Sequence, residues 1–440
     1  MTGEETIFAL ASAAGRAGIA VIRLSGGRTR QALKALNCPV PPPRKAARAR
    51  FMDPKTSALL DDGLLLWFPA PHSFTGEDVA ELHVHGGRAV IESILNALNG
   101  LPGLRPAEPG EFTRRAFAHD KMDLTQAEAL ADLVDAETQA QQKQALRQMG
   151  GALKELYDDW RHRLVQALAH LEAVIDFPDE DLPPEVADKV WGEVDDLQKA
   201  IAGHLDDGGR GERIRDGLMI AIVGPPNAGK SSLLNTLAKR DAAIVSAIPG
   251  TTRDIIDVHM NLGGYAVTLA DTAGLREASD VIEDEGIRRA RARAADADLK
   301  IVIFDGALYP ARDPAITAMI DGDALIVVNK ADLLAAPHAE AGAHFISVKT
   351  GFGMDAFVAA LEKAIVRKAE TGAAIPLTRA RHRKALEECA AALQRSRTAP
   401  LPELAAEDLR LAAKALGRLT GRVDVEEILD VVFRDFCIGK

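Results

Sequence analysis

The sequence predicts a multidomain protein that combines α/β domains with an α-helical domain. Short β-rich runs broken by Gly and Pro fill the first part of the chain, and helical periodicity follows them. From Gly217 onward, apolar strand patterns alternate with helical stretches, and helical patterning alone then returns near the C-terminus. We therefore expect a doubly wound α/β domain inserted into a discontinuous helical domain.

Residues 1–118 are expected to form the N-terminal α/β domain. Predicted strands at 19–24, 64–68 and 79–84 are separated by turn-forming clusters such as the prolines at 41–43. This mixture of short strands and breaks is typical of a compact mixed domain.

The helical domain is expected in two parts, residues 119–215 and 371–440. Its first part carries one buried stripe of apolar residues at three- and four-residue spacing: Leu153, Leu156, Trp160, Leu164, Leu168, Leu171 and Val174. Gly150 and Gly151 precede this stripe and predict a break between two helices. The helical patterning that resumes at Thr378 predicts that the second part packs against the first.

Residues 216–370 are expected to form the inserted domain. The run at 218–223 (LMIAIV) is apolar throughout, which is typical of a parallel strand buried on both faces. Strands and helices then alternate up to about residue 370, which predicts a Ras-like doubly wound sheet.

Composition and charge argue against a membrane protein, a secreted protein and a protein that coats nucleic acid. No window approaches the roughly 18 consecutive apolar residues of a membrane helix, and the acidic N-terminus predicts no secretory signal. Three scattered cysteines fit a reducing cytoplasm. The net charge of −11 argues against a protein that coats nucleic acid, although basic clusters at 44–50, 288–293 and 379–384 leave local contacts open.

A phosphate-binding motif follows the first strand of the inserted domain. Residues 224–231 (GPPNAGKS) match G-x-x-x-x-G-K-[ST] and precede a run of good helix formers. Backbone N–H groups at such a helix start bind phosphate, the lysine reaches the β and γ oxygens, and the serine hydroxyl binds magnesium. The predicted nucleotide contacts here are Gly224, Asn227, Ala228, Gly229, Lys230, Ser231 and Ser232.

Two later motifs predict guanine as the base. Asn329, Lys330 and Asp332 follow an apolar run and are predicted nucleotide contacts. In this pattern the Asp332 carboxylate accepts two hydrogen bonds from the guanine edge. Adenine lacks these paired donors, so we expect GTP rather than ATP to be bound. Ser347 and Lys349 belong to a segment that resembles the loop closing over the base.

Two further segments are expected to act as switches around the γ-phosphate. Asp271 ends an apolar run and is expected to hold magnesium through water, while the backbone of Gly274 senses the γ-phosphate. Thr252, next to Thr251, is predicted to supply the second magnesium hydroxyl beside Ser231. Leu275 stands where Ras-like enzymes place a water-orienting glutamine, so another group must take that role.

Several segments beyond the nucleotide motifs together resemble the MnmE (TrmE) family of tRNA-modifying GTPases. The resemblance covers nearly the whole chain, at residues 74–78 (FTGED), 85–87 (HGG), 109–117 (PGEFTRRAF), 120–123 (DKMD), 250–254 (GTTRD), 271–280 and 437–440 (CIGK). The N- and C-terminal segments separate this family from Era-like and EngA-like GTPases, which share only the nucleotide motifs.

The resemblance implies a homodimer that works in the cytoplasm with an FAD-containing protein of the MnmG (GidA) type, as a heterotetramer, with the FAD on that partner. Together they would modify carbon 5 of wobble uridines in tRNA. The implied one-carbon donor is 5,10-methylene- or 5-formyl-tetrahydrofolate, bound by Arg23, Glu81, Lys121 and Lys440.

The resemblance also implies chemistry at the phosphates and at the C-terminus. Potassium would be held by Asn227, Ser246, Ile248 and Thr251, with magnesium on the neighbouring hydroxyls. Glu283 matches the family residue that orients the attacking water, and Glu285 is the local competitor. Cys437 is a candidate catalytic thiol, although general acid–base chemistry or simple positioning is equally open.

A ribosome-assembly GTPase of the Era or EngA type, whose flanking domains only bind RNA, is the alternative function. Binding of a reduced folate discriminates between the two classes, because an assembly switch has no use for folate.

Overall fold

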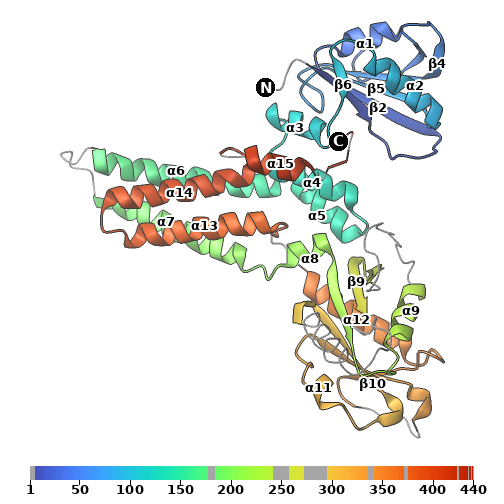
Figure 1. Ribbon diagram of the computed structural model, residues 1–440. Coiled ribbons are helices and arrows are strands. Elements are labelled where there is room, and N and C mark those ends of the chain that lie inside the picture. Colours follow the sequence, from blue (N-terminus) through green and yellow to red (C-terminus); the bar gives the residue numbers. More distant parts are fainter. Residues whose placement is uncertain are drawn as a thin grey trace, which may run out of the picture. The chain divides into compact units, whose positions relative to one another are not determined.

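The computed structural model describes residues 5–176, 184–240, 257–271, 295–334, 340–370, 375–423, 426–434, 436, 437 and 439 (Figure 1). The chain forms two compact units. The first contains residues 1–131, 154–158 and 416–440, and the second contains residues 132–153 and 159–415.

A six-stranded sheet forms the centre of the first unit, in the order β3-β4-β5-β2-β1-β6. Its neighbouring strands are antiparallel except for β1 and β6, which are parallel. The strands are β1 (Thr6–Leu10), β2 (Ile19–Ser25), β3 (Ala47–Met52), β4 (Leu59–Phe68), β5 (Val79–His85) and β6 (Leu104–Pro106). The three strand regions expected from the sequence are therefore confirmed, and the strand expected at 64–68 begins earlier, at Leu59.

Two helices cover one face of this sheet, α1 (Thr29–Ala35) and α2 (Arg88–Asn99) (Figure 1). Leu33, Ile94 and Leu98 on these helices are fully buried against the sheet. Side chains alternate along a strand, so β2 sends every second residue into this core and leaves Arg23 for the other face.

The other face is covered in part by α3 (Glu111–Ala118), whose Phe112 packs with Ile7 and Ala9 of β1. A separate cluster joins α4 (Leu124–Asp135) to α15 (Glu426–Arg434) through Leu124 and Phe433. The first unit thus brings the C-terminal helix next to the segment that follows the sheet.

Six helices outside the inserted domain lie wholly or mostly in the second unit: α5 (Gln139–Met149), α6 (Ala152–Asp176), α7 (Pro184–Leu205), α8 (Arg210–Asp216), α13 (Ala380–Thr398) and α14 (Pro402–Thr420). Ion pairs connect segments from before and after the inserted domain: Arg410 of α14 binds Glu172 of α6 at 2.8 Å, and Arg397 of α13 binds Asp195 of α7 at 2.9 Å. The discontinuous helical domain expected from the sequence is confirmed.

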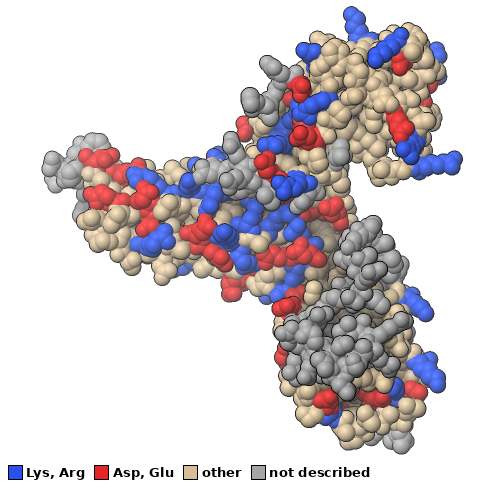
Figure 2. Space-filling model, viewed as in Figure 1, with Lys and Arg blue, Asp and Glu red and all other residues tan. Residues whose placement is uncertain are grey.

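Acidic and basic side chains are interspersed over the helices of the second unit (Figure 2). In the cluster at 379–384, Arg379 donates to Asp132 at 2.6 Å and Arg383 donates to Asp207 at 2.8 Å. These two arginines are therefore already paired with carboxylates within the protein, which makes them poor candidates for binding phosphate groups of a nucleic acid.

The inserted domain is a second six-stranded sheet, in the order β12-β11-β10-β7-β9-β8, parallel except for the β8–β9 hairpin. Its strands are β7 (Leu218–Val223), β8 (Asp257–Leu262), β9 (Tyr265–Asp271), β10 (Leu299–Asp305), β11 (Ala324–Asn329) and β12 (Ala343–Phe345). Its helical elements are α9 (Lys230–Arg240), α11 (Pro314–Thr317), α12 (Met354–Ala369) and the 3-10 turns η1 (Gly306–Leu308) and η2 (Ala331–Leu333).

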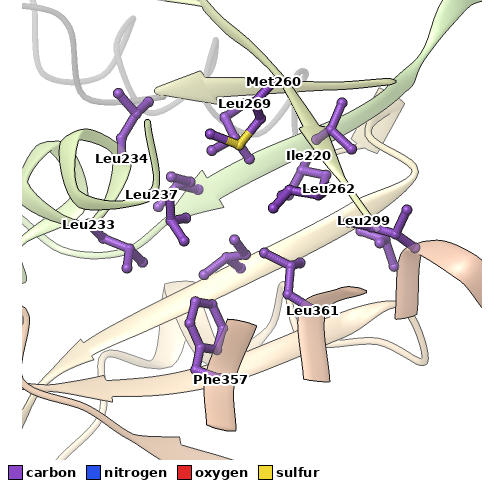
Figure 3. Packing of buried hydrophobic residues seen from close by; sticks show 14 of the residues in the cluster. Ile220, Leu233, Leu234, Leu237, Met260, Leu262, Leu269, Leu299, Phe357 and Leu361 are labelled. Atoms are coloured by element: carbon purple, nitrogen blue, oxygen red, sulfur yellow. The ribbon is translucent and has the colours of Figure 1, made fainter. Parts of the chain in front are cut away.

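Apart from the exposed Met219, the residues of β7 are buried on both faces, which explains its apolar sequence. Ile220 faces a core built with α9 and α12, where Leu237 and Phe357 also lie (Figure 3). Ala221 and Val223 pack on the opposite side, against a second apolar cluster. The predicted doubly wound arrangement is confirmed. Among the described helices, none has the length and apolar character needed to cross a membrane.

Candidate functional site

The phosphate-binding motif lies between β7 and α9, as the sequence pattern predicts. Lys230 is the first residue of α9, and its side chain folds back over the loop. Its Nζ donates to the carbonyl oxygens of Gly224 at 2.8 Å and Pro225 at 2.9 Å. The ammonium group is therefore held within the loop by backbone acceptors.

The remaining residues of this loop fit a bound phosphate group. The N-terminus of α9 presents the positive end of the helix dipole, and backbone N–H groups at such a helix start donate to phosphate oxygens. Ser231 and Ser232 are exposed there, and Asn227 is exposed with a left-handed φ of 63°. These donors and the lysine suit the phosphates of a nucleotide.

Asn329 connects the phosphate loop to the base-binding segments. It is only 3% exposed, and its Nδ2 donates to the carbonyl oxygen of Ala228 at 2.9 Å. Its Oδ1 accepts a hydrogen bond from the Val348 N–H at 3.2 Å. A Cβ at Gly229 would lie 2.2 Å from Asn329 Nδ2, at a backbone φ of 96°, so only glycine permits this approach. The Asn329 side chain thus connects its own motif to the phosphate loop and to the segment at 347–349.

The base-recognition residues follow β11. Asp332 lies in η2 with its side chain exposed, and Lys330 adopts a left-handed φ of 60°. Lys330 Nζ lies 2.6 Å from Oδ2 of Asp305, the last residue of β10. Asp305 was not identified as a site residue in the sequence analysis, although an acidic residue at the end of an apolar strand indicates such a position.

The segment after β12 forms a tight turn. Ser347 is fully buried, its N–H donates to the Phe352 carbonyl at 2.9 Å, and its Oγ accepts from the Thr350 N–H at 3.2 Å. Lys349 is exposed on the same turn. The structure therefore brings this segment to Asn329 and the phosphate loop.

Some of the predicted site residues lie outside the described part of the chain. For Asp271 the backbone ends β9, but its side chain is not described. The residues outside the described ranges are Ser246, Ile248, Thr251, Thr252, Gly274, Leu275, Glu283, Glu285 and Lys440.

A second group of predicted residues meets in the first unit. Arg23 of β2 lies opposite Glu81 of β5, and its Nε and Nη2 donate to Glu81 Oε1 at 3.1 and 2.9 Å. The Arg23 guanidinium lies 5.5 Å from the ring centroid of Phe74 and 5.8 Å from that of Phe112. These contacts fix the direction of both side chains on the sheet face that α1 and α2 leave uncovered.

Lys121 approaches the same region through the loop at 74–78. A Cβ placed on Gly76 would lie 3.4 Å from Lys121 Cε, and Phe74 of this loop contacts Arg23. The loop therefore lies next to both Lys121 and Arg23.

A buried polar network holds this loop and the start of α3, and sequence reasoning missed its members. Arg115 is 5% exposed and its Nη1 lies 3.1 Å from Glu77 Oε1, while its Nη2 lies 2.9 Å from Glu111 Oε1. Ser25 Oγ donates to Glu77 Oε2 at 2.6 Å. Burial opposes ionisation of Glu111, but hydrogen bonds from Arg105, the Glu108 N–H and Arg115 lower its pKa below the usual value. The motifs at 74–78 and 109–117 are thus joined by charged hydrogen bonds.

The C-terminal tail contacts the same part of the first unit. Gly110 lies two residues before Phe112, and its N–H points to the carbonyl oxygen of Cys437 at 3.5 Å. Gly439 has a φ of 99°, and a Cβ there would lie 2.3 Å from the Leu10 carbonyl oxygen. The Cys437 thiol is exposed, whereas the other two cysteines are buried.

The sequence matches the profile of the MnmE helical domain over residues 124–437. The chain belongs to the MnmE family of tRNA modification GTPases. A second profile, described as GTP-binding protein TrmE N-terminus, matches residues 6–121. These two matches confirm the family expected from the sequence motifs. They cover the flanking domains and favour this family over the ribosome-assembly alternative.

Full-length relatives agree with the family match. Proteins named tRNA modification GTPase MnmE from Rhodospirillum rubrum and Paramagnetospirillum magneticum are 58% and 59% identical to this chain. Each alignment covers 99% of this chain, and 99% and 100% of the respective relatives. Among solved structures, the G domain of the T. maritima FeoB iron transporter is 25% identical, covers 35% of this chain and 99% of that chain, and has a TM-score of 0.25.

Proposed function

We propose that this MnmE-family chain is the GTP-hydrolysing subunit of a complex that modifies carbon 5 of wobble uridines in tRNA, forming aminomethyl or carboxymethylaminomethyl groups. It would act in the cytoplasm as a homodimer, in a heterotetramer with an MnmG (GidA)-like protein that carries FAD. A reduced folate, 5,10-methylene- or 5-formyl-tetrahydrofolate, is the proposed one-carbon donor.

One observation carries the folate part of this proposal. The family segments at 74–78, 109–117 and 437–440 are far apart in sequence, yet described residues of all three lie in one region of the first unit, around Arg23 and Glu81. An ionised carboxylate accepts hydrogen bonds from the N–H donors of a pterin ring, and cations suit the carboxylates of a folate tail. We therefore assign Arg23, Glu81, Lys121 and Lys440 to folate.

In the nucleotide site, we propose that Lys230 and the N–H groups at the start of α9 bind the phosphates of GTP. Lys330 and Asp332 contact the guanine nucleotide, and the Asp332 carboxylate accepts hydrogen bonds from the guanine edge. Glu283 orients the attacking water. Ser231 and Thr252 would hold magnesium, which offsets phosphate charge when bound.

Potassium is the proposed second cation. Asn227, Ser246, Ile248 and Thr251 would supply its oxygen ligands, and when bound it would offset charge that develops on the phosphates, as an arginine finger does. The described member of this set, Asn227, has an exposed side chain on the phosphate loop, which is compatible with a ligand role.

Folate binding tests the proposed function. The purified protein should bind 5-formyl-tetrahydrofolate in a calorimetric titration, and Glu81→Gln should weaken that binding by about 10- to 100-fold, because a hydrogen bond to a charged group is lost. Glu92→Gln is the matched control, since it also removes a carboxylate paired with an arginine, Arg88, but on the exposed face of α2. Failure of the unmodified protein to bind folate would contradict the proposal and favour an assembly switch.

Cation dependence tests the proposed potassium site. We expect GTP hydrolysis to be faster in potassium chloride than in sodium chloride, because sodium is too small to span the oxygens of Asn227 and the switch segment. Asn227→Gly should remove the difference, since glycine keeps the left-handed φ of 63° but has no amide oxygen. Equal rates in the two salts for the unmodified protein would refute the proposed site.

A further inference from the structure

The side chain of Lys330 is held by a carboxylate outside the nucleotide-binding motifs. Lys330 Nζ and Asp305 Oδ2 are 2.6 Å apart, and the Asp305 side chain is only 13% exposed. The Lys330 side chain is 34% exposed, so it stays partly accessible although its ammonium group is paired with Asp305. This pair lies at the carboxyl ends of β10 and β11, the sheet edge at which open α/β sheets bind ligands.

The backbone fixes the direction of the Asp305 carboxylate. Asp305 pairs with Asn329 in the parallel register of β10 and β11, which places it beside the residue that precedes Lys330. Its Oδ1 accepts the Ala307 N–H at 2.9 Å, so its second oxygen is left for Lys330. Burial opposes ionisation, but the hydrogen bonds from Lys330 and the Ala307 N–H lower the pKa of Asp305, and the carboxylate stays charged at neutral pH.

We propose that Asp305 is a positioning residue of the nucleotide site, which acts by holding Lys330 in the orientation that meets the guanine base. This inference rests on the proposed contact of Lys330 with the nucleotide. A lysine side chain loses considerable conformational entropy when its rotamer is fixed. The ion pair with Asp305 fixes the rotamer before GTP binds, so less entropy is lost on binding. This ion pair stabilises the complex with GTP and the transition state equally, so it lowers KM without changing kcat.

The first test measures steady-state GTP hydrolysis by the full chain carrying Asp305→Asn. The amide keeps an oxygen for the Ala307 N–H but loses the charge that holds Lys330. We expect KM for GTP to rise about five-fold with kcat unchanged, in line with the modest strength of a partly exposed ion pair. Inhibition by inorganic tripolyphosphate, which has no base, should stay at the wild-type level.

Asp321→Asn is the matched control. Asp321 binds Lys300, the second residue of β10, at 2.5 Å, so the control removes a similar Lys–Asp pair near the start of the same strand. It should leave KM for GTP unchanged. If Asp305→Asn does not fold, as judged by its melting temperature, Asp305→Ser takes its place, because a hydroxyl also accepts the Ala307 N–H.

A double-mutant cycle with Lys330→Gln identifies the route of the effect. If Asp305 acts through Lys330, Asp305→Asn should add nothing to the KM of Lys330→Gln. The inference would be overturned if Asp305→Asn left KM for GTP unchanged, or if it raised KM equally in the wild-type and Lys330→Gln proteins. A parallel loss of tripolyphosphate inhibition in Asp305→Asn would overturn it too. If Lys330→Gln itself leaves KM unchanged, the proposed contact of Lys330 with the nucleotide fails instead, and the inference fails with it.

Discussion

Removal of residues 437–440 is expected to abolish tRNA modification in cells while GTP hydrolysis by the purified protein remains intact. The tail contacts the first unit at Gly110 and Leu10, close to Phe112, which packs against Arg23. The described nucleotide motifs belong to the second unit, so the deletion leaves them unchanged. The level of modified wobble uridine in tRNA from a deletion strain, measured by mass spectrometry, gives the readout.

Two point variants separate the chemistry of the tail from its position. Cys437→Ser removes the exposed thiol and should lower modification only if sulfur takes part in the reaction. Gly439→Ala keeps the thiol but places a Cβ 2.3 Å from the Leu10 carbonyl oxygen at a φ of 99°, so it should displace the tail. Normal modification in the deletion strain would show that the tail is only a chain terminus.

The nucleotide motifs could be predicted from the sequence because each one is local. A strand, a glycine-rich turn and a helix start are encoded within a few consecutive residues, and Lys230 lies where that pattern requires. The same holds for the strand before Asn329 and the 3-10 turn that carries Asp332.

The contacts that join these motifs could not be predicted, because they depend on strand register. Asp305 meets Lys330 because β10 and β11 pair in parallel with Asp305 opposite Asn329, and no spacing rule in the sequence states that alignment. Arg115 and Glu77 likewise meet only when α3 packs beside the loop at 74–78. Without structural context, a buried arginine and an exposed arginine have the same sequence signature.

The role of the basic clusters could not be predicted from the sequence either. The sequence left 379–384 open as a contact surface for nucleic acid, but Arg379 and Arg383 are bound to aspartates within the second unit. A run of cations in the sequence gives no information on the carboxylates that tertiary packing brings to it. For this reason the proposed tRNA substrate rests on family membership and not on charge.

Replacement of Asp332 by asparagine is expected to change the preferred base from guanine to xanthine. The carboxylate offers two acceptors to the N1–H and the exocyclic amine of guanine, and an amide would place its own donor against that amine. Loss of a matched pair in a polar site is costly, so we expect KM for GTP to rise by at least about 100-fold. Xanthine has a carbonyl oxygen where guanine has the amine, and this oxygen accepts from the asparagine amide.

Steady-state hydrolysis of GTP and of xanthosine triphosphate by the same protein preparation measures this change. Asp332 is exposed in η2, so the substitution should leave the melting temperature unchanged. Asp321→Asn, at the other edge of the sheet, is a control that should keep the preference for GTP. Recovered turnover with xanthosine triphosphate would show that Asp332→Asn retains a working phosphate site and has altered only base recognition. Loss of both activities, or undiminished use of GTP, would remove Asp332 from base selection.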